Sequence, residues 1–342
     1  MKSNLTFVVV LFWAVSASAV TIDMVTVGNA GNAPDTRYNG MSVGAVDHVY
    51  QIGKYEVTAG QYTEFLNAVA KADPNGLYNT SMGDTSDNVI TGRGANIQRA
   101  GSSPDYSYSV AADWANRPVN YVSFWDAARF ANWLHNGQPT GPEGPGTTED
   151  GAYHDVGNQT LFGRNAGAQF FIPTQDEWYK AAYHKNDGAT GNYWNYPTAS
   201  NTAPINTLPD TGNHANIYDH AGTGNHNYTI GSPYYRTEVG AFQNSESPYG
   251  TFDQGGNVVE WTEGIDSTSL RIVRGGSYER GIESDSLEAY RSGGASPNIE
   301  WPFYGFRVAS AGVPEPSSFA LAVVALAALP TRRRKSVPHN RV

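Results

Sequence analysis

Helical periodicity is scarce in this 342-residue chain, and the scarcity limits the folds available to it. Only three segments place apolar residues along one helical face, and the clearest stripe is Tyr62, Phe65, Leu66 and Val69. Each segment follows a helix-capping residue: Thr58, Ser123 or Thr174, the last in a T-x-x-E capping box with Glu177. Glycine, asparagine, serine and tyrosine are abundant between the segments. The sequence therefore predicts an α+β fold with few helices, short strands and much ordered loop.

The apolar clusters are spread along the chain without a break, which favours one domain. Residues 71–116 and 136–167 are rich in Gly, Asn, Asp and Pro and are expected to be surface insertions. No internal repeat of about 20–50 residues occurs, so a solenoid is not expected.

The N-terminus has the pattern of a secretory signal peptide. Lys2 is followed by an apolar run over residues 5–15 and then by Ser16, Ala17, Ser18 and Ala19. Small residues at the two positions that a signal peptidase reads predict cleavage after Ala19, so residues 1–19 are the signal peptide. A buried N-terminal strand is the alternative.

The C-terminus has three parts in a fixed order. Residues 313–316 read VPEP, residues 319–329 are apolar, and residues 332–335 are basic. Eleven apolar residues are short for a membrane span, which needs about 20 residues. Residues 313–342 resemble the PEP-CTERM sorting signal, which implies an exosortase-type sorting machinery as partner. A plain membrane anchor is the alternative. In either case the membrane is contacted only through this tail, and the protein is exported to the cell envelope, cell surface or extracellular matrix.

The composition excludes several functions. No Asp or Glu lies before Ala19 or after Pro330, whereas six of the 22 basic residues do, so 16 basic residues face 32 acidic ones, a balance of −16. Such an acidic region does not bind nucleic acid non-specifically. The chain has no cysteine, which excludes disulfides, thiolate catalysis, thiolate zinc sites and iron–sulfur clusters.

Six motifs follow one another along the middle of the chain. They are residues 52–58 (IGKYEVT), 117–123 (RPVNYVS), 172–178 (IPTQDEW), 249–261 (YGTFDQGGNVVEW), 274–278 (RGGSY) and 304–308 (YGFRV). Their order resembles the formylglycine-generating enzyme family, also called sulfatase-modifying factor domains. The resemblance covers about Thr26 to Ala309 and assigns residues 20–312 to this domain. It implies a variant of the C-type-lectin-like fold.

The best-known activity of the family is the oxidation of a sulfatase cysteine to formylglycine with oxygen and copper. The resemblance places the two copper-binding cysteines a few residues after the RGGSY motif, at about Arg280 and Asp285. Copper(I) needs soft thiolate ligands, which a guanidinium or carboxylate does not replace. We therefore expect no copper and no oxidase activity by the cysteine mechanism.

The resemblance also implies calcium. The family's calcium-binding segment matches residues 253–260, with side-chain oxygens from Asp253 and Glu260 and carbonyl oxygens from Gly256 and Val258. Calcium prefers six to eight hard oxygens, and the expected role is structural. The alternative is a glycine turn that leads into a tryptophan-bearing strand.

Asn216 and Ile217 match the first half of a second family calcium site. The other half falls near residues 231–233, where no carboxylate is found.

The resemblance also implies a ligand groove. Arg274, Tyr278 and Arg291, with Arg307, flank it and are candidates for binding a peptide or an anion. The alternative for Arg274 and Arg307 is that they tie strands to buried carboxylates, and this alternative is favoured for Arg307. Trp261 and Trp301 are candidates for a sugar-binding face, or they belong to the core.

Other catalytic patterns are missing from the sequence. The histidines form no zinc motif, and His214, His220 and His226 are expected to be solvated loop residues. No G-x-S-x-G and no P-loop occurs, and no spacing picks out a pair of acid/base carboxylates.

Three functions are consistent with these observations. The first is an exported, surface-associated, calcium-stabilised binding or structural module. The second is an enzyme of the same family with divergent, non-cysteine oxidoreductase or other chemistry in the same groove. The third is a matrix component that binds an extracellular polysaccharide or a protein ligand.

Overall fold

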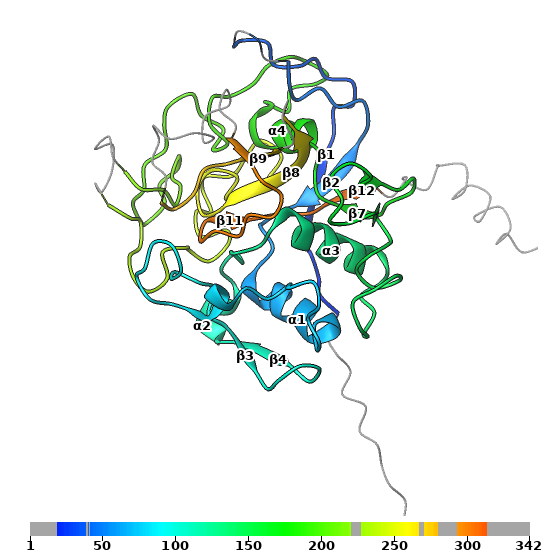
Figure 1. Cartoon of the computed structure of the whole chain (residues 1–342). Helices are drawn as coiled ribbons and strands as arrows, with labels where there is room; N and C mark the ends of the chain where they lie inside the picture. Colours follow the sequence, from blue (N-terminus) through cyan, green and yellow to red (C-terminus); the bar gives the residue numbers. More distant parts are fainter. Residues whose placement is uncertain are drawn as a thin grey trace, which may run out of the picture. The chain divides into compact units, whose positions relative to one another are not determined.

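A computed structural model describes residues 19–38, 40, 42–219, 227–266, 270–279 and 293–312 (Figure 1). The chain divides into one compact unit that extends to Ala311 and a second from Gly312 to Val342, of which only Gly312 lies in the described ranges. Within these ranges, no helix is long and apolar enough to cross a membrane.

The three predicted helices are confirmed: α1 (Ala59–Val69), α3 (Phe124–His135) and α4 (Gln175–Tyr183). Each begins with a capping box in which the side chains of Thr58, Ser123 or Thr174 accept a hydrogen bond from the backbone three residues later. The short helix α2 (Ala112–Ala115) and the 3₁₀ turn η1 (Thr80–Gly83) were not predicted.

Two four-stranded sheets form the scaffold. The first has the order β1 (Met24–Val27), β2 (Tyr50–Gly53), β12 (Ala309–Ala311) and β7 (Phe170–Phe171), all antiparallel. The second has the order β10 (Gly293–Ala295), β9 (Arg271–Arg274), β8 (Val259–Ile265) and β11 (Tyr304–Gly305), with β11 parallel to β8. The pairs β3 (Ile97–Ala100) with β4 (Ser107–Val110) and β5 (Tyr153–His154) with β6 (Gly163–Arg164) form two further ribbons. These short strands and extensive loops confirm the predicted fold class.

One large apolar core holds most of these elements together, and two smaller clusters accompany it, one of them around Trp178 and Tyr179 of α4. The large core extends along the chain from Val27 to Ala309, and its centre is aromatic, with Phe65, Phe130 and Trp133 in mutual contact between α1 and α3. The C-terminal strand β12 and the N-terminal strand β1 both pair with β2, so the two ends of the core lie in one sheet.

The prediction that residues 71–116 form a surface insertion is wrong, because part of this segment is buried in the core. Leu77, Met82 and Ile97 are fully buried in the main core, and β4 packs against α1. The polar composition misled because a few apolar residues, widely spaced in the sequence, provide the buried face.

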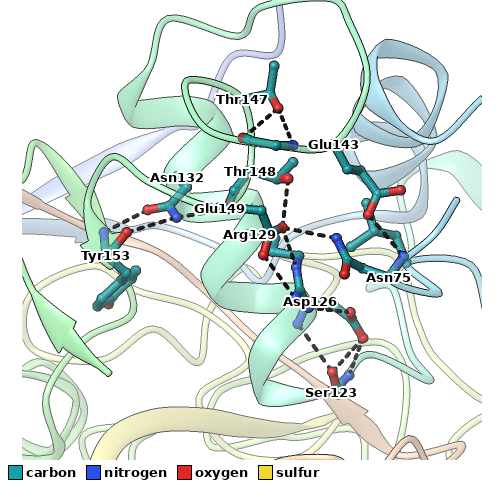
Figure 2. A network of polar contacts seen from close by, with 12 residues as sticks. Asn75, Ser123, Asp126, Arg129, Asn132, Glu143, Thr147, Thr148, Glu149 and Tyr153 are labelled. Atoms are coloured by element: carbon teal, nitrogen blue, oxygen red, sulfur yellow. Dashed lines mark hydrogen bonds and ion pairs between the residues drawn. The ribbon is translucent and has the colours of Figure 1, made fainter. Parts of the chain in front are cut away.

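Residues 136–167, also expected to be a surface insertion, are bound to α3 by side-chain hydrogen bonds. Helix α3 is buried from Phe124 to Leu134, and its polar residues Asp126, Arg129 and Asn132 recur every three positions (Figure 2). The Arg129 guanidinium binds the Glu149 carboxylate at 2.7 and 3.1 Å, and the Asn132 side chain donates to the Thr148 carbonyl at 2.8 Å. This buried polar stripe therefore fixes the loop by specific hydrogen bonds.

Candidate metal site

The site begins with the turn that enters β8. Asp253, Gly256 and Asn257 all have positive φ, at 59°, 94° and 56°. A Cβ on Gly256 would lie 2.3 Å from the backbone oxygen of Asn216, so only glycine fits there. The structure therefore brings the predicted residues Asp253, Gly256 and Val258 together in one tight turn.

Glu260 has a different role in this arrangement. Its carboxylate forms a two-point ion pair with Arg307, at 2.6 and 2.7 Å, and accepts a 2.7 Å hydrogen bond from the Trp178 indole. Both members of the pair are completely buried. Burial disfavours the charge of Arg307, but the Glu260 carboxylate outweighs this effect and raises the pKa of the guanidinium above its usual range.

Arg307 also donates to the carbonyl oxygens of Gly53, at 2.9 Å, and Phe252, at 2.8 Å. It therefore links β2, the turn and β8. The interpretation that Arg307 ties strands to a buried carboxylate is confirmed.

Glu56 is a site residue that the sequence analysis missed. Its side chain is buried, and within the described ranges its carboxylate accepts two long hydrogen bonds of 3.4 Å, from the Val258 backbone N–H and the Asn257 side-chain amide. Burial and the nearby carboxylates of Asp253 and Glu260 hold the pKa of Glu56 well above its usual range. The signal for Glu56 was a single acidic residue inside the first motif, two positions before the Thr58 cap.

Asp253 lies in the same environment. Its carboxylate accepts a 2.6 Å hydrogen bond from the Gly240 backbone, and burial raises its pKa to about 6 despite the opposing effects of that bond and of Arg307. Glu56 and Asp253 thus form an acidic pair that the single positive charge of Arg307, already bound to Glu260, does not neutralise.

We tested whether these groups fit calcium. Glu56 and Asp253 are hard oxygen donors beside a sharply turned backbone, which suits calcium. Glu260 fits only if it exchanges Arg307 for the ion. Across the described ranges, no three His, Asp or Glu side chains gather closely enough to hold a metal ion. The oxygen donors and the negative charge of Glu56 and Asp253 fit a hard cation. Glu260 does not fit one in its present position, because its carboxylate is paired with Arg307.

Asn216, a candidate for the second calcium site, lies directly against this turn. Its side chain is buried and donates to Asn257 at 2.8 Å and to the Tyr235 carbonyl at 3.0 Å, while its side-chain oxygen Oδ1 has no hydrogen-bond partner. Ile217 is fully buried beside it. Residues 231–233 are exposed and add no carboxylate.

The residues expected to flank an open ligand groove are largely interior. Arg274 is 1% exposed, with its guanidinium over the Tyr179 ring, and Tyr278 is completely buried against Tyr235. In this structure both side chains therefore lie under aromatic rings, and their role beside a ligand groove stays a prediction. Arg291 lies outside the described residues.

Arg280 and Asp285, the positions that match the copper-binding cysteines, also lie outside the described residues.

The histidine expectation needs a correction. His214 is buried, and its ring contacts the Thr207 carbonyl at 2.7 Å and the Thr211 hydroxyl at 3.1 Å. It is therefore a satisfied interior residue rather than a solvated one. His220 and His226 lie outside the described residues.

A comparison with known protein families identifies the class of domain. Residues 22–311 match the family described as the Sulfatase-modifying factor enzyme 1-like domain. The chain belongs to that family.

One solved structure supports the same fold, and two others are similar at lower TM-scores. Treponema denticola variable protein 1 aligns with a TM-score of 0.50 and 19% identity, over 86% of this chain and 97% of that protein. CarF aligns with a TM-score of 0.46 and 20% identity, over 85% and 98% of the two chains. PvdO from Pseudomonas aeruginosa aligns with a TM-score of 0.44 and 17% identity, over 84% and 94%. No curated protein matches the chain. At these identities the likeness concerns the fold alone.

Proposed function

We propose that this protein is an exported, surface-associated binding or structural module that uses the family scaffold without the oxidase chemistry. One observation carries the proposal: the family domain spans residues 22–311, yet the chain has no cysteine. Copper-dependent cysteine oxidation needs thiolate ligands that this chain does not possess.

The signal peptide over residues 1–19 and the sorting tail over residues 313–342 support the location. An exosortase-type machinery would recognise the tail and hold the protein at the cell envelope, cell surface or extracellular matrix. Its contact with the membrane would be limited to that tail. The acidic balance between the ends disfavours nucleic acid as a partner.

Calcium is proposed as a structural cofactor of the domain. Support comes from the buried, incompletely neutralised pair Glu56 and Asp253 beside the Gly256 turn. Such an ion would remove the repulsion between the two carboxylates and link the loop before α1 to the entry of β8. The unpaired side-chain oxygen of Asn216 is a further hard donor next to the turn.

An extracellular polysaccharide or a protein is the proposed ligand. Trp301 is 43% exposed while its ring stacks on Tyr304, with the ring centres 6.0 Å apart. An exposed ring supported in this way is suited to stacking on a sugar. Trp261, by contrast, is fully buried, so it belongs to the core.

An enzyme with divergent chemistry is the alternative. Asp126 and Glu143 favour it, because burial raises the pKa of each to about 7, in the range suited to general acid–base catalysis. This alternative predicts turnover that is lost in Asp126→Asn while the melting temperature is kept.

Two assays test the proposal on residues 20–312. The first incubates the protein with a cysteine-containing sulfatase peptide, copper and oxygen and follows the peptide by mass spectrometry. We expect no formylglycine, whereas a family member with both copper cysteines should convert the peptide. Conversion by this chain would refute the non-catalytic role.

The second assay measures binding to polysaccharides from the source organism. Trp301→Ala should weaken binding at least tenfold, and Leu161→Ala, which removes another exposed apolar side chain, should not. If no polysaccharide binds, the polysaccharide ligand is refuted and a protein ligand remains proposed. Affinity capture of proteins, with Trp301→Ala as the matched control, would then test the protein ligand.

A further inference from the structure

The side chain of Gln138 holds the backbone of Val20 at two points. The Val20 N–H donates to Gln138 Oε1 at 2.6 Å, and Gln138 Nε2 donates to the Val20 carbonyl at 2.8 Å. The next residue is held as well, because the Gln61 side chain donates to the Thr21 carbonyl at 2.9 Å. Two side chains that lie 118 and 40 residues further along the sequence therefore fix the chain at this point.

The backbone around Gln138 is shaped for this contact. Gly137 and Gln138, directly after α3, have φ of 81° and 60°, and the Gln138 N–H donates to the Trp133 carbonyl at 2.9 Å. Positive φ is uncommon for a residue other than glycine and is found often at functional positions. The turn keeps Gln138 at the C-terminal end of a 12-residue helix, where the helix dipole favours a positive charge.

Val20 is the residue that signal-peptide cleavage after Ala19 would expose. Hydrolysis of the Ala19–Val20 bond adds water across it, leaving a carboxylate on Ala19 and an α-ammonium group on Val20. We propose that Gln138 and the C-terminal end of α3 form the binding site for this new α-ammonium group. The inference rests on the proposed export, and not on the ligand or the calcium ion.

The chemistry favours the cleaved form. In the uncut chain, Gln138 Oε1 accepts from a neutral amide, whereas after cleavage it accepts from a charged group, and charge-assisted hydrogen bonds are shorter and stronger. Val20 and Ile22 pack against the main core, and β1, an edge strand, begins at Met24. Binding of the new terminus would therefore hold the edge strand against fraying, so that maturation stabilises the domain.

A double-mutant cycle tests the site in residues 20–312, prepared with a free Val20 amine or with the same amine acetylated. In the wild type, we expect the free form to melt about 2–4 °C higher, the shift that one charge-assisted bond produces in a domain of this size. Gln138→Glu should widen this difference, because a carboxylate forms an ion pair with the ammonium of the free form but only accepts from a neutral amide in the acetylated form. The lost bond to the Val20 carbonyl is common to both forms and cancels. Gln98→Glu, at an exposed glutamine on β3, should leave it unchanged.

Equal melting temperatures for the free and acetylated wild-type proteins would overturn the proposal, and this comparison does not depend on any variant folding. An equal effect of acetylation in wild type and Gln138→Glu would overturn it too. As a second measurement, an acylating reagent should modify the α-amine at least threefold more slowly in the wild type than in Gln138→Met. Mass spectrometry of the exported protein should find Val20 first, and any other N-terminus contradicts the assignment. None of these measurements reads ligand binding or oxidation.

Discussion

Removal of the Arg307 guanidinium should cost the domain much of its stability. Arg307 is completely buried, forms two short bonds to Glu260, and satisfies the carbonyls of Gly53 and Phe252. Arg307→Met keeps much of the volume but leaves a buried carboxylate and two buried carbonyls without this partner. Loss of one member of a buried pair costs about 3–5 kcal/mol. Since domains of this kind are stable by about 5–15 kcal/mol, that loss is a large fraction of the total.

Urea unfolding of residues 20–312 in chelator is the appropriate assay. The midpoint should fall by the expected amount with little change in slope. The double variant Glu260→Gln/Arg307→Met removes the charge left behind, so its loss should be clearly less than the sum of the two single losses. Lys71→Met, at an exposed lysine, is the control and should change stability by no more than about 0.5 kcal/mol. A loss below about 1 kcal/mol for Arg307→Met, or additive single losses, would show that the pair does not stabilise the fold.

The other predictions concern calcium, pH, the turn and a helix cap. Calcium at about 100 times its dissociation constant should stabilise residues 20–312 by about 2.7 kcal/mol, and equal melting temperatures in calcium and chelator would remove the calcium proposal. Burial raises the pKa of Asp126 and Glu143 to about 7 each, so the native state favours their protonated forms. In chelator, the stability that these two groups contribute should be greatest below about pH 4 and should be lost as pH rises through about 7. Asp126→Asn should therefore flatten the plot of melting temperature against pH between about pH 5 and 8. Gly256→Ala should cost at least about 1–3 kcal/mol in urea unfolding because of its positive φ and the 2.3 Å approach to Asn216, and a neutral effect would show that the turn relaxes. Thr174→Ala should cost about 1 kcal/mol through the lost cap, with Thr174→Ser as the conservative control.

The parts of the fold that the sequence predicted are the ones decided locally. A capping box joins residues three positions apart. Thr58, Ser123 and Thr174 therefore predicted the starts of their helices without any knowledge of the tertiary structure. The segment 253–260 was singled out because it resembles the family's calcium-binding segment, and that resemblance lies within eight consecutive residues.

The parts that could not be predicted depend on contacts between distant segments. Glu56 reaches the turn across 201 residues to Asn257, and Arg307 reaches Gly53 across 254. The burial of the polar stripe of α3 was not predicted, because residue type alone does not show that the loop carrying Thr148 and Glu149 covers it (Figure 2). Burial of Arg274 has the same origin, since its aromatic cover comes from α4.

These long-range contacts also explain how the scaffold can be kept while its chemistry changes. The described ion pair between Arg307 and Glu260 links β2, the turn and β8, and the capping boxes fix the helices; none of these contacts includes the positions that match the copper-binding cysteines. Loss of the thiolate ligands therefore leaves these particular contacts in place. Under the proposed export, the contacts that we expect to stabilise the domain are the buried pair of Arg307 and Glu260, the acidic site beside it and the anchored N-terminus.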